Sequence, residues 1–229
     1  MSMRGLTKSA NDKKGFTLVE LMVALAIAGI VAGGLYTIYM SQQKSFAAQE
    51  QMTQLQEKMR AVLYFMVREI SMAGCDPTGE AGAHIISADS DQIRFTEDID
   101  GDGNTDEYNE DIEYSLYVSG GVKKLGRRSP SSANRQPVAE YIDALDFVYL
   151  DEEGKALPTP VTDPSKIHSV QITVVGRSER PDSNYMDTDI YRNQQGDIIF
   201  NPPDDHYRRL LLSAEVFCRN LAFKRHLYR

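Results

Sequence analysis

Residues 16–40 read FTLVELMVALAIAGIVAGGLYTIYM and follow directly on Lys13, Lys14 and Gly15. The last twenty of these residues, 21–40, carry no charged side chain. Twenty helical residues rise by about 30 Å, which matches the hydrocarbon core of a bilayer. The stretch therefore predicts a membrane-spanning helix with one carboxylate, Glu20, near its start. Because an ionisable group in such a helix is costly, we expect Glu20 to have a function.

The charges before this helix predict its orientation. Four basic residues and one acidic residue precede it: Arg4, Lys8, Lys13, Lys14 and Asp12. The positive-inside rule places residues 1–15 in the cytoplasm and everything after residue 40 across the membrane.

Two other interpretations fit the apolar run by itself. A secretory signal peptide is cut after its apolar region at a small-x-small site, whereas this run is longer than a typical signal core and polar residues 41–44 follow it. A plain single-pass anchor explains the run but not the order of Gly15, Phe16 and Glu20.

The helix is predicted to continue well beyond the membrane. Apolar residues recur at steps of three and four, which is the pattern of one buried helical face. They are Met52, Leu55, Met59, Val62, Met66, Ile70 and Ala73. Gly74 and Pro77 then end the pattern. We expect one helix over about residues 16–73, with a membrane-embedded first half and an amphipathic second half.

The remainder of the chain has the pattern of β-strands. Apolar and polar residues alternate over 92–96, 112–118, 145–150 and 170–175, and 210–217 is a candidate closing strand. Residues 139–145 are interpreted as a short helix or an irregular lead-in, and 179–205 as a long polar loop or an insertion. The sequence predicts an α+β fold in which the long N-terminal helix packs on an antiparallel β-sheet. The expected segments are 1–15, 16–40, 41–75 and a β-rich domain over 76–229.

Composition limits the possible partners. The 189 residues after Met40 are enough for one domain with a sizeable core. Removal of residues 1–15, which hold four basic residues and one acidic residue, changes the formal charge from −8 to −11. Such an acidic domain argues against nucleic acid as a partner.

The chain contains two cysteines, Cys75 and Cys218. In an oxidising compartment they are a plausible disulfide pair. The alternative is two separate buried thiols.

Residues 98–109 resemble the calcium-binding loops of EF-hand-like and dockerin-like proteins. Oxygen ligands stand at loop positions one, three, five and nine, and glycine at position six permits a sharp turn. The candidate Ca²⁺ ligands are Asp98, Asp100, Asp102, Asp106 and Asn109. Asn109 replaces the usual acid at position twelve, and Glu110 or Asp111 is a candidate substitute. The alternative is a solvated acidic hairpin turn.

No catalytic motif is present in the sequence. The four histidines, at 84, 168, 206 and 226, have no metal-ligand spacing. We therefore expect no enzymatic activity, although an anchored periplasmic enzyme stays open as an alternative.

The stretch from Lys13 to Glu20 resembles the processing site of type IV prepilins and pseudopilins. The resemblance implies a leader peptide over 1–15, cleavage after Gly15 and methylation of the new N-terminal Phe16. It also implies that Glu20, the fifth residue of the mature chain, aligns the subunit with its neighbour during docking.

Within that family the chain looks most like PilW-type minor pilins. The features that carry this likeness are the helix end Arg68–Cys75, the strand 145–150 with Asp151–Gly154, and the closing Arg219-Asn220-Leu221. Major pilins commonly have a proline in the middle of the anchoring helix, and this sequence has none between Phe16 and Ala73.

The resemblance implies a minor pilin that helps to initiate pilus assembly in a priming complex at the filament tip. Its partners would be other minor and major pilins, prepilin peptidase, the inner-membrane assembly platform and a tip adhesin. The protein would sit in the bacterial inner membrane with a periplasmic domain before entering a pilus or pseudopilus. The alternatives are a J-type pseudopilin of type II secretion and a membrane-anchored calcium-dependent adhesin or sensor.

Overall fold

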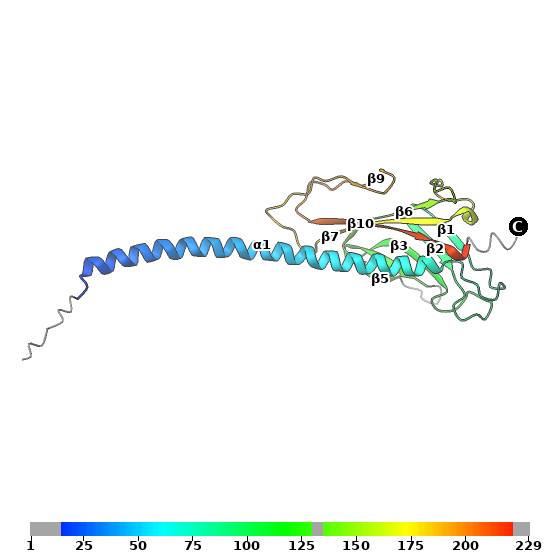
Figure 1. Ribbon diagram of the computed structural model, residues 1–229, viewed down its shortest axis with the longest axis horizontal. Coiled ribbons are helices and arrows are strands. Elements are labelled where there is room, and N and C mark those ends of the chain that lie inside the picture. The colour runs from blue at the N-terminus through cyan, green and yellow to red at the C-terminus, as the bar shows by residue number, and fades with distance from the viewer. Residues whose placement is uncertain (1–14, 130–134, 222–229) are drawn as a thin grey trace, which may run out of the picture. The chain divides into compact units, whose positions relative to one another are not determined.

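The computed structural model describes residues 15–129 and 135–221. The expected leader therefore lies outside the described residues, apart from Gly15. Residues up to Ala48 form one unit, and the chain from Gln49 onward forms a second, compact unit. Helix α1, Leu18–Met72, contributes to both units, and all the strands belong to the second (Figure 1).

The first part of α1 is apolar and uncovered. Between Leu18 and Tyr39 its large apolar side chains are more than half exposed; Leu18 is 74% exposed and Tyr39 is 54% exposed. By length and composition α1 is the helix among the described residues that is able to cross a membrane. This agrees with the predicted span over 21–40.

The later turns of α1 bury the predicted stripe. The buried residues of this helix are Leu55, Met59, Val62, Met66 and Ile70. They recur every three or four residues, so they lie on one face of the helix. The amphipathic half is thereby confirmed as the part of α1 that packs on the domain.

Helix α1 ends one residue before the predicted boundary. Gly74 follows with a φ of +77°, the left-handed conformation that commonly closes helices. A Cβ at this position would lie 2.4 Å from the Leu221 side chain. Glycine is therefore required both by the backbone and by the close approach of the C-terminal segment.

Within the described residues, ten strands form three antiparallel sheets. The first sheet runs in chain order through β1 (Ile85–Ala88), β2 (Gln92–Thr96), β3 (Asp111–Ser119), β4 (Val122–Arg128) and β5 (Gln136–Glu140). The second has the order β10 (Arg209–Phe217), β7 (Ser169–Arg177), β6 (Ile142–Leu150). The third is the hairpin of β8 (Tyr191–Arg192) and β9 (Ile198–Phe200). A short 3-10 helix, η1 (Pro164–Lys166), precedes β7.

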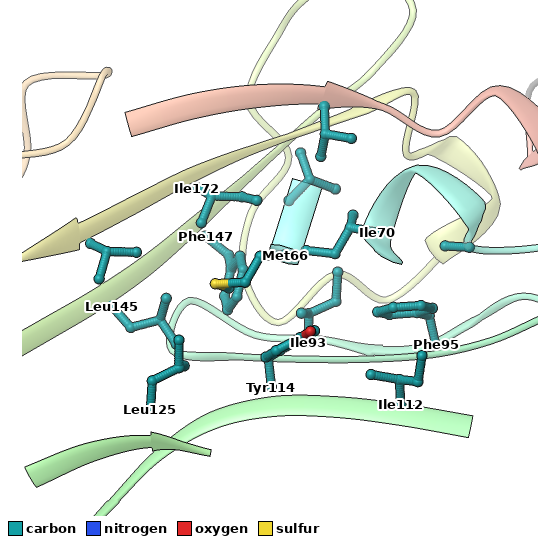
Figure 2. Close-up of a cluster of buried hydrophobic side chains, with 14 of the residues drawn as sticks. Met66, Ile70, Ile93, Phe95, Ile112, Tyr114, Leu125, Leu145, Phe147 and Ile172 are labelled. Atoms are coloured by element: carbon teal, nitrogen blue, oxygen red, sulfur yellow. The ribbon is translucent and has the colours of Figure 1, made fainter. Parts of the chain in front are cut away.

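The core lies between α1 and the two larger sheets. Figure 2 shows Met66 and Ile70 of α1 among side chains from both sheets. The first sheet supplies Ile93, Phe95, Ile112, Tyr114 and Leu125, and the second supplies Leu145, Phe147 and Ile172. The predicted α+β class, a long helix on antiparallel sheet, is confirmed.

One sequence interpretation was wrong. Residues 139–145 are neither a helix nor irregular, because β5 ends and β6 begins there, separated by Tyr141 with a φ of +63°. Residues 179–205 form an insertion between β7 and β10 that contains the short β8–β9 hairpin. Both segments lack the clear alternation of apolar and polar residues that identified the longer strands.

We predict that Met66→Ala lowers the free energy of unfolding by about 2–5 kcal/mol, because it leaves a cavity in the core. Tyr64→Ala is the matched control, since Tyr64 is 73% exposed and Met66 is 0% exposed on the same helix. Its expected effect is within about 0.5 kcal/mol. Urea unfolding of the full-length protein in detergent micelles, followed by circular dichroism, measures both. Equal losses would contradict the packing described above.

Candidate functional site

Glu20 caps the helix to which it belongs. Its Oε2 accepts hydrogen bonds from the Thr17 N–H at 2.8 Å and the Thr17 hydroxyl at 2.9 Å. In return the Glu20 N–H donates to the Thr17 hydroxyl at 3.3 Å. Thr17 precedes the first residue of α1 and Glu20 is the third, so the pair is a capping box. The carboxylate therefore satisfies polar groups that helix termini leave without partners.

Sequence reasoning missed this local role of Glu20. The signal was present, since threonine followed three positions later by glutamate before an apolar run is the capping-box signature. Beside the cap, Phe16 is 91% exposed. A Cβ on Gly15 would meet nothing within 4 Å. The proposed cleavage position is thus sterically open.

The acidic loop between β2 and β3 brings three predicted ligands together. Carboxylate oxygens of Asp98, Asp100 and Asp102 all lie within 4.8 Å of one another. Asp98 is buried, whereas Asp100 and Asp102 are exposed. Three carboxylates so placed present hard oxygen ligands, which fit Ca²⁺ better than a soft metal.

Asp98 also organises the loop backbone. Its carboxylate accepts the N–H of Gly101 at 2.6 Å and the N–H of Gly103 at 3.2 Å. Both glycines have positive φ, 78° and 85°, so the chain can wrap around this carboxylate. Asp102 donates its own N–H to Asp100 at 3.1 Å.

The other two predicted ligands, Asp106 and Asn109, do not belong to the group of three carboxylates. Asp106 is outside the group of three and donates its N–H to Asn104 at 3.1 Å. Asn109 has a φ of 73° and donates its N–H to the Ser129 hydroxyl at 3.3 Å.

The proposed substitutes at position twelve are engaged elsewhere. Asp111 forms a bidentate pair with Arg94, at 2.8 and 2.5 Å. Glu110 closes the base of the loop by accepting the Ile99 N–H at 2.9 Å.

The loop has a strongly negative potential. The carboxylates of Asp100 and Asp102 raise the pKa of the exposed Glu107 above its ordinary value. Like charges favour the protonated form of a neighbouring acid, and a bound cation relieves the same repulsion.

A buried polar network joins the last turns of α1 to the first sheet. Glu69 accepts a hydrogen bond from the Tyr114 hydroxyl at 2.5 Å and from Arg127 Nε at 2.9 Å. Glu97 is also buried beside this network, and burial together with the charge of Glu69 raises its pKa to about 7. Its Oε2 has no hydrogen-bond partner among the described residues.

The two cysteines lie on segments that meet at the end of α1. Cys75 follows the helix, and Cys218 follows β10. Just beyond Cys218, Asn220 donates its side-chain amide to the Met72 carbonyl at 3.2 Å. This placement is compatible with the predicted disulfide, which stays a prediction.

Ion pairs and hydrogen bonds hold the segment 178–208 against the second sheet. The buried Arg209 binds Asp143 at 2.6 Å, Asp187 at 2.9 Å and Asp205 at 2.6 Å. Asn193 and Gln195 of the β8–β9 hairpin bond to Asp146 and Gln171, at 2.9 and 2.8 Å. Sequence reasoning missed this cluster because Asp143 and Asp187 are far from Arg209 in the chain.

The comparison with protein families matches the N-terminal part of the chain. Residues 10–36 match the family described as the prokaryotic N-terminal methylation motif. The match includes Gly15, Phe16 and Glu20 and ends within the apolar half of α1.

Comparisons with whole proteins show a likeness to solved structures. Curated protein sequences give no match. Among solved structures, the chain is similar to a type IV-like pilin from Thermus thermophilus. The identity is 14% and the TM-score 0.48, over 73% of this chain and 98% of the other. The chain thus carries an N-terminal methylation motif at the start of a long apolar helix that leads into antiparallel sheet.

Proposed function

We propose that this protein is a minor subunit of a type IV pilus. The observation that carries the proposal is the methylation motif at residues 10–36, placed where the uncovered apolar helix begins. Prepilin peptidase cleaves the precursor after Gly15 and methylates Phe16. The fold then serves as a structural element and not as an enzyme.

The exposed apolar half of α1 requires a covering partner. Its side chains are uncovered by the chain itself, and an apolar surface of this length is stable only in lipid or against other apolar helices. Before assembly the inner membrane supplies that cover. In the filament the helices of other minor and major pilins replace it.

Glu20 has two successive roles in this scheme. In the single chain it caps α1 through Oε2, as described above. Its hydrogen bonds with Thr17 fall on that oxygen, which leaves Oε1 to accept the charged α-amino group of Phe16 from the same or a neighbouring subunit. In a low-dielectric environment such an ion pair is strong, so it aligns the incoming subunit.

The more specific proposal is a PilW-type pilin in a priming complex at the filament tip. The absence of proline between Phe16 and Ala73 supports a minor rather than a major subunit. The assembly platform and a tip adhesin are the further partners of that complex. A J-type pseudopilin of type II secretion is the alternative, and genes for secretion components beside this gene would favour it.

A second candidate function rests on the acidic loop. We propose that Asp98, Asp100 and Asp102 contribute ligands to one Ca²⁺ ion, with Asp106 and Asn109 completing the site. The ion would supply the positive charge that this loop lacks. If the chain never enters a filament, this site makes a membrane-anchored calcium-dependent adhesin or sensor the better description.

We predict that the mature protein begins at Phe16 and carries one methyl group on its α-amino nitrogen. Mass spectrometry of the N-terminal peptide from the native host measures this. A Gly15→Leu variant is the control and should retain its leader, because a bulky side chain fills the cleavage position. An intact leader in the unaltered protein would overturn the proposal.

We predict that Glu20→Ala reduces the number of filaments by about tenfold or more, since it leaves the α-amino group of Phe16 without its ion-pair partner in a low-dielectric environment. Glu57→Ala is the control, because Glu57 is exposed on the same helix and should leave filaments unchanged. Electron microscopy counts the filaments, and immunoblotting confirms equal protein levels. Normal piliation in the Glu20 variant would favour the adhesin or sensor.

We predict that the full-length protein binds Ca²⁺ with a dissociation constant of about 1 mM or tighter. The double variant Asp100→Asn and Asp102→Asn should lose this binding, because it removes two of the three clustered carboxylates. Asp163→Asn alters an exposed acid outside the loop and should bind normally. Isothermal titration calorimetry in detergent measures all three. No heat from the unaltered protein at millimolar Ca²⁺ would remove the site.

A further inference from the structure

The two larger sheets have four edges, and both edges of the first sheet carry protection against pairing. Strand β1 has only four residues, and its register shifts between Ile85 and Ser87. Strand β5 has five residues, includes Pro137 and faces a register shift in β4. Short strands, bulges and proline are the devices by which proteins prevent an edge from accepting another strand.

One edge of the second sheet is covered by other segments. Along β6, Phe147 donates its N–H to Ser90 at 2.7 Å. Further along, the Tyr149 carbonyl accepts the Leu157 N–H at 2.8 Å. The backbone groups on that side of β6 are therefore already used.

Strand β10 has none of these devices. It pairs with β7 over nine residues, Arg209 to Phe217, without a register shift. It contains neither proline nor lysine. In the described part of the chain no other strand pairs with its outer side. Of the four edges, β10 is thus the long, regular and open one.

The register identifies the groups at this open edge. The Arg208 carbonyl accepts the Ser178 N–H at 2.8 Å, and Cys218 donates to the His168 carbonyl at 2.9 Å. In an antiparallel pair, hydrogen bonds to one neighbour alternate along the strand. The even-numbered residues of β10 therefore bond to β7. The odd-numbered ones direct their N–H and C=O groups outward: Leu211, Ser213, Glu215 and Phe217.

The side chains at the edge define what would fit against it. Glu215 is exposed, and its two oxygens accept hydrogen bonds from Ser169 at 2.7 Å and Gln171 at 3.2 Å. Both donors are neutral, so neither of them is a cationic partner for this carboxylate. Phe217 is 53% exposed two residues further along on the same face. On the opposite face Leu212 is only half-buried against the core.

We propose that the outer edge of β10 is an interaction surface that accepts an extended strand from a partner protein. The backbone of that strand pairs with the four outward-facing residues. Its side chains present a lysine or arginine to Glu215 and an apolar group to Phe217, and apolar residues on its other face extend the cover over Leu212. A second copy of this chain is disfavoured, because pairing would bring together two acidic chains, each of formal charge −8 with residues 1–15 and −11 without them.

The test uses the full-length protein in detergent micelles and a synthetic probe. The probe is a nine-residue peptide in which valine alternates with threonine and the central threonine is replaced by lysine. A second peptide has glutamate at that position. Amide hydrogen exchange, resolved by residue, is measured without peptide and with each peptide at about 1 mM.

Without peptide, the amides of Leu211, Ser213, Glu215 and Phe217 should exchange fast, and those of Leu210, Leu212, Ala214 and Val216 slowly. The lysine peptide should slow the four outward amides by about tenfold or more. The glutamate peptide should bind about fivefold more weakly, and Glu215→Lys should reverse that preference.

Ser213→Pro removes one outward N–H and should abolish the protection, whereas Ser213→Ala keeps that N–H and should retain it. Slow exchange of the even-numbered amides reports that each variant is folded, and Glu215→Lys tests the edge without altering the backbone.

Three results would overturn the proposal. They are no protection by the lysine peptide, protection that persists in Ser213→Pro, and slow exchange of the outward amides before peptide is added. In the last case, dependence on protein concentration would identify a second copy as the occupant, and independence would identify this chain's own residues.

Discussion

The structure of the second unit depends on the burial of one helical face. Met59, Met66 and Ile70 have no exposed surface, and each contacts a core that both larger sheets share. Neither sheet buries its inner face without the helix, and a helix with this stripe is not stable alone in water. The later turns of α1 therefore hold the two sheets together as one domain.

Polar contacts determine where helix α1 begins and ends, which apolar packing alone does not. Non-directional apolar burial sets no unique end for a helix, whereas hydrogen bonds do. Glu69 ties the last turns of α1 to Tyr114 and Arg127, and Asn220 binds the final carbonyl at Met72. The first turn is closed in the same way by Thr17 and Glu20. Specific hydrogen bonds therefore define each end of the helix.

The candidate functional features lie outside the packed core of helix α1 and the two larger sheets. The acidic loop emerges between β2 and β3, and the insertion before β10 is held to the second sheet by Arg209. Loops on a rigid scaffold commonly carry binding sites because their side chains are not needed for packing. The free edge of β10 belongs to the same group, since its outward backbone groups take no part in the core.

The membrane-competent helix, the buried stripe, the helix end at Gly74 and the principal strands could all be predicted from the sequence. These follow from local periodicity and backbone preference, which involve residues only a few positions apart. The sequence also located the three clustered carboxylates, because Asp98, Asp100 and Asp102 lie in one loop.

The remaining features became visible only in the folded protein. The split into two sheets, the contact of Glu69 with Arg127, the cluster around Arg209 and the open edge of β10 all join segments distant in the chain. No spacing rule relates such residues, because their distances are set by how the layers pack and not by the geometry of one element.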